Sequence, residues 1–181
     1  MPCTVTPGPL AGLLVIQPRV FGDDRGYFYE SYNAEDLAAH GLNLPFVQDN
    51  HSKSSRGVLR GLHFQREPHA QGKLVRVVKG RVWDVAVDLR PGSPTRGKWY
   101  GLELSEATKT MFYIPPGFAH GFVALEDGTE FLYKCTAGYS KESEGGIRWD
   151  DPTLAIAWPD LGVPFLVSEK DAVLPPYGDL K

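Results

Sequence analysis

Most apolar residues of this chain fall in short segments in which apolar and polar positions alternate. Side chains on a strand point to its two faces in turn, so a period of two predicts β-strands. The segment Arg81–Leu89 shows the pattern well, with Trp83, Val85, Val87 and Leu89 on one face and Asp84, Ala86 and Asp88 on the other. We expect strands in eight segments: Leu13–Gln17, Gly26–Tyr32, Val58–Gln65, Lys73–Val78, Arg81–Leu89, Lys98–Leu104, Thr110–Ile114 and Glu130–Thr136.

Helix signals are fewer. Asn33 is a favoured N-cap residue, and two acidic residues follow it, so the sequence predicts a short helix over Ala34–His40. Ser105–Thr108 and Ser168–Asp171 each predict a single capped turn. Many short strands separated by turns predict an all-β fold, either a sandwich, a jelly roll or a barrel. Such folds enclose a space between sheets, so we expect a site lined by inward side chains from several strands.

Turn-forming residues are spread over the whole chain, which has 181 residues, 20 of them Gly and 15 Pro. No repeat or linker divides it, so we expect one domain over residues 1–181. The stretch from about Asp150 contains five prolines, and we expect it to wrap the barrel.

Composition limits the classes of function. Hydrophobic residues make up 42% and charged residues 23%, which is typical of a soluble globular protein. The net charge of −3 leaves no basic excess for nucleic-acid binding. Apolar runs such as Phe118–Leu125 are far shorter than the roughly 18 residues of a membrane helix. The first residues lack the pattern of an export signal, so we expect a cytoplasmic protein in which Cys3 and Cys135 are free thiols.

The segment Val58–Gln65 places Arg60 and His63 among apolar strand residues. A histidine there is either a buried imidazole bonded to the backbone or a functional group, and a nearby arginine needs an anionic partner. Three positions separate the two residues, so a regular strand would point them to opposite faces. Gly61 lies between them and predicts a bulge that would bring both to one pocket.

Three further residues have both structural and chemical interpretations. Lys73 begins a strand and is either a solvated lysine or, in a hairpin with the preceding strand, a neighbour of His63. Tyr133 shares a strand face with Phe131 and Cys135, which favours an inward position, where a tyrosine is ordinarily a core residue whose hydroxyl meets a backbone group. Asp171 suits the first turn of a helix but could also orient a histidine.

The segment Pro115–Phe122 predicts a strand end, a tight turn and a new strand. Its Pro-x-Gly-x-x-His spacing resembles the second motif of the cupin superfamily, in which the histidine ligates a metal. The first metal-cupin motif needs two histidines one residue apart and then a glutamate. Here Gln65 occupies the second of those positions, and His69 and Glu67 are misplaced. We therefore expect no metal site.

Taken together, six motifs resemble the dTDP-4-dehydrorhamnose 3,5-epimerases, in the same order from about Gly12 to Pro176. They are Asp24–Phe28, Gln48–Ser52, Gly57–Gln65, Gln71–Val75, Ile114–Phe122 and Ser168–Asp171. The resemblance implies a cupin-type jelly roll that forms a homodimer and needs no cofactor. It implies epimerisation of dTDP-4-dehydro-6-deoxy-D-glucose at carbons 3 and 5, which gives dTDP-4-dehydro-L-rhamnose.

The resemblance also implies roles for individual residues. His63 would be the base, Asp171 the carboxylate bonded to it, Tyr133 the acid on the opposite face, and Lys73 the group facing the enolate. Arg25, Arg60 and Lys170 would bind the diphosphate, and Tyr139 would stack on thymine. Further substrate contacts would come from Glu30, Gln48, Asn50, His120 and Glu144.

One position departs from the family, whose members often carry two adjacent tyrosines where this chain has Gly138 and Tyr139. The shape of the pocket, and with it the number of carbons inverted, therefore stays open. Alternatives are a mono-epimerase at carbon 3 or 5, a sugar-binding cupin without turnover and a metal cupin. A binder would need the arginines but not His63, Lys73, Tyr133 and Asp171 together.

Overall fold

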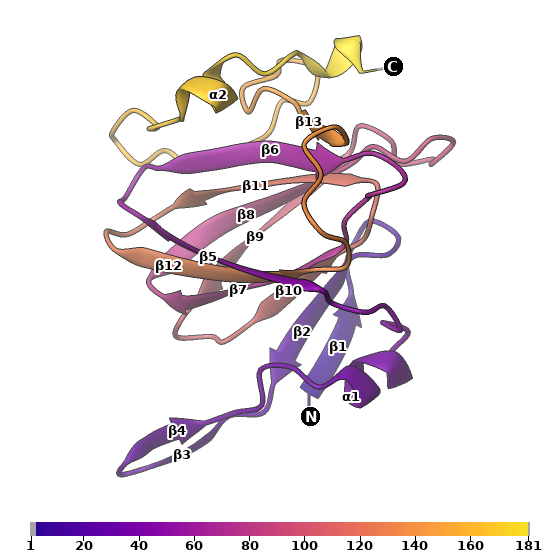
Figure 1. The fold of residues 1–181 in the computed structure, drawn as a ribbon. Coiled ribbons are helices and arrows are strands. Elements are labelled where there is room, and N and C mark those ends of the chain that lie inside the picture. Colours follow the sequence, from indigo (N-terminus) through magenta and orange to yellow (C-terminus); the bar gives the residue numbers. More distant parts are fainter. Residues whose placement is uncertain (1–2, 181) are drawn as a thin grey trace.

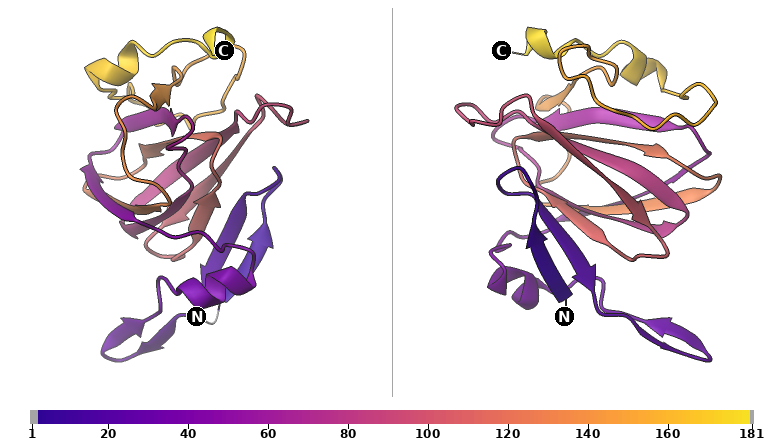
Figure 2. Two further views of the ribbon diagram at one scale, coloured as in Figure 1. Left: turned by 45° about the vertical axis from the view of Figure 1, so that its right-hand side comes forward. Right: turned by 180° about the vertical axis from the view of Figure 1, so that it is seen from behind.

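The computed structural model describes residues 3–180, and its main body consists of two antiparallel β-sheets that face each other (Figure 1). This arrangement is all-β, as the alternating segments predicted, and it is the jelly roll that the resemblance implied. A separate hairpin of β3 (Phe21–Asp23) and β4 (Gly26–Phe28) projects away from both sheets (Figure 1, Figure 2).

The first sheet has six strands in the order β1-β2-β10-β7-β12-β5. Its strands are β1 (Cys3–Pro7), β2 (Leu14–Pro18), β5 (Gln48–Ser54), β7 (Lys73–Lys79), β10 (Met111–Ile114) and β12 (Thr129–Cys135). The second sheet has five strands in the order β13-β6-β11-β8-β9. Its strands are β6 (Leu59–Gln65), β8 (Arg81–Asp88), β9 (Trp99–Ser105), β11 (Phe118–Ala124) and β13 (Glu144–Gly146). The short helices are α1 (Ala34–Ala39), α2 (Glu169–Ala172) and a 3₁₀ turn at Tyr177–Asp179.

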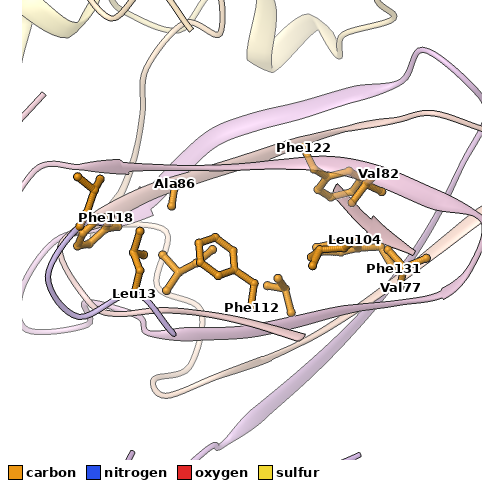
Figure 3. Close-up of a cluster of buried hydrophobic side chains, with 12 residues drawn as sticks. Leu13, Val77, Val82, Ala86, Leu104, Phe112, Phe118, Phe122 and Phe131 are labelled. Atoms are coloured by element: carbon orange, nitrogen blue, oxygen red, sulfur yellow. The ribbon is translucent and has the colours of Figure 1, made fainter. Parts of the chain in front are cut away.

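The main core fills the space between the two sheets. Figure 3 shows aromatic side chains at its centre, with Phe112 from β10 and Phe122 from β11 projecting into the same layer. Phe122 stacks on Phe131 of β12 with ring centroids 4.2 Å apart. Such contacts join the two sheets across the interior.

The outer face of the five-stranded sheet is covered as well. Trp83, Val85 and Val87 of β8 pack there against residues of the C-terminal stretch, among them Leu154 and Trp158. Figure 1 shows this stretch lying across β6 and carrying α2 to the rim of the barrel. The two faces of β8 therefore divide as the alternation predicted, and both are buried.

Most predicted elements are present, with three differences. The predicted strand Gly26–Tyr32 ends early, at Phe28. β6 and β7 do not form a hairpin, because β6 pairs with β11 and β13 whereas β7 pairs with β10 and β12. Strands β1, β3, β5 and β13 were not predicted. The helix cap at Asn33 is confirmed, since its side chain accepts from the N–H groups of Glu35 and Asp36.

Two further features bear on the sequence-based expectations. Both cysteines are free, as predicted, with Cys135 buried. Within residues 3–180, no helix has the length and apolar character needed to cross a membrane.

Candidate active site

Two adjoining cavities open between the sheets, and His63, Lys73 and Tyr133 line both of them. The first has a volume of about 530 Å³, and its wall includes Arg60 and residues of the α2 region. The second has a volume of about 400 Å³ and is lined by the polar side chains of β5 and by Tyr139. His63 comes from the five-stranded sheet, whereas Lys73 and Tyr133 come from the six-stranded sheet. These three side chains therefore approach the same space from opposite walls.

His63 is held by a buried carboxylate. Its Nε2 lies 2.7 Å from Oδ1 of Asp171, whose side chain is only 5% exposed. The other carboxylate oxygen, Oδ2, accepts a hydrogen bond from the Gly61 N–H at 3.2 Å. Burial alone would raise the pKa of Asp171, but the hydrogen bonds from His63 and Gly61 outweigh it and lower the pKa below its ordinary value. Asp171 is therefore an acceptor that fixes the ring of His63.

The local fold explains why Asp171 reaches His63. Ser168 caps α2, and its hydroxyl accepts from the Asp171 N–H at 3.1 Å. This single turn packs on β6, so the aspartate points into the barrel rather than into solvent. The capped turn predicted from the sequence is thus the element that completes the histidine–carboxylate pair.

A bulge in β6 brings Arg60 and His63 to the same cavity. On β11, His120 pairs with His63 and Phe122 with Arg60, so two positions of β11 oppose three of β6. The extra residue restores the parity that a regular strand would lose. Gly61 has a φ of +125°, and a Cβ there would lie 2.6 Å from the Cα of Gly121. Only glycine suits this position, and the bulge predicted there is confirmed.

Lys73 and Tyr133 form the opposite wall. Lys73 is 9% exposed, and burial lowers the pKa of its ammonium group. Its Nζ lies 5.9 Å from the centre of the Tyr133 ring, within the range of a cation–π contact. Burial raises the pKa of Tyr133, so its phenol keeps its proton at neutral pH. The wall therefore presents a buried amine and an O–H donor to the cavity.

The second cavity has a polar rim. Gln48 accepts the Tyr139 N–H at 2.8 Å and donates to Asn50 at 3.1 Å. The Tyr139 hydroxyl donates to Glu144 at 3.1 Å, and Lys170 pairs with the other oxygen of Glu144 at 2.5 Å. The hydrogen bond from Lys170 lowers the pKa of Glu144. This network holds the ring of Tyr139 at the mouth, where the residue is 59% exposed and offers a surface for an aromatic base.

His120 lines the first cavity and is 6% exposed. Its Nε2 lies 2.9 and 3.1 Å from the two carboxylate oxygens of Asp84. Among the residues that the structure describes, no cluster of three or more His, Cys, Asp or Glu side chains could hold a metal ion. His120 thus has a carboxylate partner in place of the further ligands that a metal cupin would supply.

Two residues of the predicted site lie elsewhere. Arg25 lies in the projecting β3–β4 hairpin, where its guanidinium pairs with the carboxylate of Asp23. The side chain of Arg25 is 90% exposed. Glu30 follows the hairpin and accepts a hydrogen bond from Asn33 at 2.9 Å. Neither residue lines either cavity. The other eleven predicted residues do: His63, Tyr133, Asp171, Lys73, Gln48, Asn50, Arg60, His120, Tyr139, Glu144 and Lys170.

The structure also places residues at the site that were not predicted there. Asp84 was assigned only to a strand face, and its contact with His120 needs the register between β8 and β11. Ser52, Gln65 and Gln71 line the cavities too. The inward face of β5, with polar residues at every second position, is the signal that could have revealed Ser52.

Comparisons with known proteins agree with this geometry. The family model described as dTDP-4-dehydrorhamnose 3,5-epimerase matches residues 7–179. The dTDP-4-dehydrorhamnose 3,5-epimerase of Salmonella typhimurium is 55% identical over 164 residues, which cover 90% of this chain and 89% of the relative.

Solved structures extend the likeness to three dimensions. The dTDP-6-deoxy-D-glucose-3,5-epimerase of Legionella pneumophila, solved with dTDP-4-keto-L-rhamnose, has a TM-score of 0.95 and 47% identity, and the match covers 99% of this chain and 95% of that one. A 3′-monoepimerase from Streptomyces bikiniensis, solved with dTDP-quinovose, has a TM-score of 0.89 and 34% identity, with 94% and 86% covered. A family match over nearly the whole chain, together with relatives at this identity, is decisive: this chain belongs to the dTDP-4-dehydrorhamnose 3,5-epimerase family.

Proposed function

We propose that this chain epimerises dTDP-4-dehydro-6-deoxy-D-glucose at carbons 3 and 5 and so produces dTDP-4-dehydro-L-rhamnose. Both carbons flank the ketone at carbon 4, so removal of either proton gives an enolate whose charge lies on the ketone oxygen. Inversion needs a base on one side of the ring and an acid on the other. The observation that carries the proposal is that His63 and Tyr133 face one cavity from opposite sheets.

His63 is suited to remove the protons. A carboxylate only accepts hydrogen bonds, so the contact with Asp171 assigns the ring proton to Nε2 and leaves Nδ1 as the basic nitrogen. When Nδ1 takes a proton from carbon 3 or 5, the imidazolium lies beside the ionised Asp171, which stabilises it. The bond from Gly61 holds the carboxylate in place during this step.

Tyr133 and Lys73 complete the reaction from the other wall. The raised pKa of Tyr133 keeps a proton available for transfer to the face opposite His63. The Lys73 ammonium supplies positive charge to the enolate oxygen, and its burial makes that charge more effective than it would be in water. These steps use protein groups alone. Activity that survives exhaustive dialysis against a chelator would agree with this, whereas loss that is restored by a metal would contradict it.

The nucleotide part of the substrate fits the basic side chains of the first cavity and the polar rim of the second. Arg60 donates to Ser54 and to the Lys53 carbonyl, which orients its guanidinium at the first cavity. Arg60 and Lys170 give this region local positive charge, although the whole chain is acidic. We assign the diphosphate to these two residues and the thymine base to the exposed ring of Tyr139.

We also propose that the active form is a homodimer in which the β3–β4 hairpin of one copy reaches the cavity of the other. The hairpin projects from the body (Figure 2) and carries the exposed aromatic residues Phe21, Tyr27 and Phe28. An isolated hairpin with exposed aromatics is stabilised by a partner surface. This exchange would bring Arg25 and Glu30 to a cavity that they do not reach within their own chain.

A complementation experiment tests the exchange. The variants Arg25→Ala and His63→Asn are each expected to be weakly active, and mixed dimers are expected to regain activity. In a mixed dimer, the intact His63 cavity receives the intact Arg25 of the other copy. No recovery in dimers verified by sedimentation would show that Arg25 acts elsewhere, and a monomer at micromolar concentration would exclude the homodimer.

Product identification tests the reaction itself. The purified protein is incubated with dTDP-4-dehydro-6-deoxy-D-glucose, and NMR follows the couplings of the hydrogens at carbons 3 and 5. We expect inversion at both carbons. Inversion at one carbon would establish the mono-epimerase alternative, and binding without turnover would establish the sugar-binding alternative.

A cytoplasmic location remains a prediction from the sequence.

A further inference from the structure

A second histidine–carboxylate pair lies deeper in the barrel than the first. His120 of β11 is the register partner of His63. The carboxylate of Asp84 on β8 accepts a hydrogen bond from Nε2 of His120. Asp84 is 0% exposed and His120 is 6% exposed, whereas the His63 side chain is 34% exposed. The His120 ring also stacks on Phe131, with centroids 6.1 Å apart. A carboxylate buried this completely destabilises the fold unless its charge is paired. The presence of Asp84 in the barrel therefore needs an explanation.

The pair fixes the tautomer of His120. Because Asp84 accepts, Nε2 carries the ring proton. Burial lowers the pKa of His120, and the attraction of Asp84 does not outweigh it, so the ring is neutral at pH 7. Nδ1 is then an acceptor, and it has no hydrogen-bond partner among the described residues. The ring therefore offers the cavity one acceptor, which suits an N–H or O–H donor.

Charged and titratable groups surround Lys73 on every side. Cys135 and Tyr133 face it from β12, His63 from β6, His120 from β11 and Asp84 from β8. Burial lowers the pKa of Lys73, and Cys135 and Asp84 act in the opposite direction. Burial and the positive charge of Lys73 both lower the pKa of His120. Asp84 is thus a carboxylate inside the barrel that acts on the lysine facing the substrate.

We propose that Asp84 is a positioning residue of the reaction, which orients the acceptor nitrogen of His120 into the cavity and places a buried negative charge on the side of the cavity that holds Lys73. The inference rests on the proposed role of Lys73 at the enolate oxygen. Asp84 touches no reacting atom and acts through two residues that line the cavity.

The variant Asp84→Asn tests this, because it removes the charge and nearly keeps the volume. We expect kcat at pH 7 to fall by at least about tenfold and the alkaline limb of the kcat–pH profile to move down by about one pH unit or more. The dissociation constant of dTDP, which lacks the sugar, is expected to stay within about threefold. An alkaline limb that coincides with that of the unmodified protein would overturn the proposal.

Asp88→Asn is the matched control. Asp88 lies on the same strand, is equally buried and pairs with Arg90, but it does not line either cavity. Its replacement is expected to lower stability without moving the pH profile. If both variants shift the profile equally, Asp84 has only a structural role, and the proposal fails.

Two measurements keep the proposal testable if Asp84→Asn does not fold. In Lys73→Arg, a guanidinium stays charged over the whole range, so the alkaline limb should disappear. A limb that persists there belongs to another group and contradicts the proposal. In the unmodified protein, ¹⁵N NMR of the imidazole rings is expected to show His120 protonated at Nε2 and bare at Nδ1. The opposite tautomer would overturn the orienting role.

Discussion

Replacing Asp171 by asparagine should disable the base while leaving the fold nearly intact. The carboxylate accepts from His63 through Oδ1 and from the Gly61 N–H through Oδ2. An amide has one oxygen, and a backbone N–H can only donate, so the oxygen must face Gly61. The amide nitrogen then faces His63 and donates to Nε2. The ring proton is forced onto Nδ1, the atom that has to receive the proton of the substrate.

The expected loss follows from that tautomer. The same exchange of carboxylate for amide in a serine-protease triad lowers kcat by roughly 10⁴-fold, which is about 5.5 kcal/mol in the activation free energy. We expect a comparable loss for Asp171→Asn, measured as the rate of formation of the inverted sugar. Despite burial, the hydrogen bond from His63 lowers the pKa of Asp171 and keeps it ionised at neutral pH, so the loss should persist across the neutral range.

Two controls separate this effect from misfolding. The dissociation constant of dTDP should change little, since Asp171 makes its hydrogen bonds to Gly61, His63 and Ser168 and not to the residues assigned to the nucleotide. Asp151→Asn removes another buried carboxylate, which accepts from the N–H groups of Thr153, Leu154 and Tyr177 away from the cavities. It should lower the melting temperature but not kcat. A rate for Asp171→Asn within tenfold of the unmodified protein would refute the histidine–carboxylate mechanism.

Three further variants give distinct results. Arg60→Ala should weaken the binding of dTDP, measured by calorimetry, by about 2 kcal/mol, which is roughly thirtyfold in Kd. The control Arg56→Ala, which lies outside the cavities, should leave Kd unchanged. If the two variants bind dTDP with equal affinity, Arg60 does not belong to the diphosphate site. Tyr133→Phe should lower inversion by about 10²–10⁴-fold yet still exchange solvent deuterium into the substrate, and parallel loss of both would argue against its role as the acid. Asp88→Asn should lower the free energy of unfolding at pH 7 by about 3 kcal/mol, because the amide keeps only one of the two oxygens that accept from Arg90, Ser93 and Thr95. The hydrogen bonds to the Asp88 carboxylate outweigh its burial and lower its pKa. The difference in unfolding free energy between the variant and the unmodified protein should therefore shrink as the pH falls below the ordinary pKa of an aspartate. A difference that persists in acid would contradict the stabilising role of the Asp88 carboxylate.

The sequence allowed the strands of the hydrophobic core to be predicted, because their apolar residues alternate. It did not reveal β5, whose residues Gln48–Ser54 include no large apolar side chain. That strand pairs with β12 along its whole length, and its inward residues line the cavity instead of the core. A strand whose buried face binds ligand loses the pattern by which strands are recognised.

The candidate site was predicted from motifs rather than from spacing, and the structure shows why. Regular strand parity would have separated Arg60 from His63, and the bulge at Gly61 reverses that outcome. Asp171 lies 108 positions from His63, so no local pattern joins the two. Asp84 gave no signal beyond its strand face, because its partner depends on the register between β8 and β11.

Isotope exchange with His63→Asn tests the central claim most directly, which is that one base serves both carbons. The variant and the unmodified protein are incubated with dTDP-4-dehydro-6-deoxy-D-glucose in deuterated water, and NMR measures deuterium at carbons 3 and 5. The unmodified protein should incorporate deuterium at both positions. The variant should lose incorporation at both carbons together, by about 10²–10⁴-fold. Exchange at either carbon at the rate of the unmodified protein would assign that carbon to a different base and contradict the account.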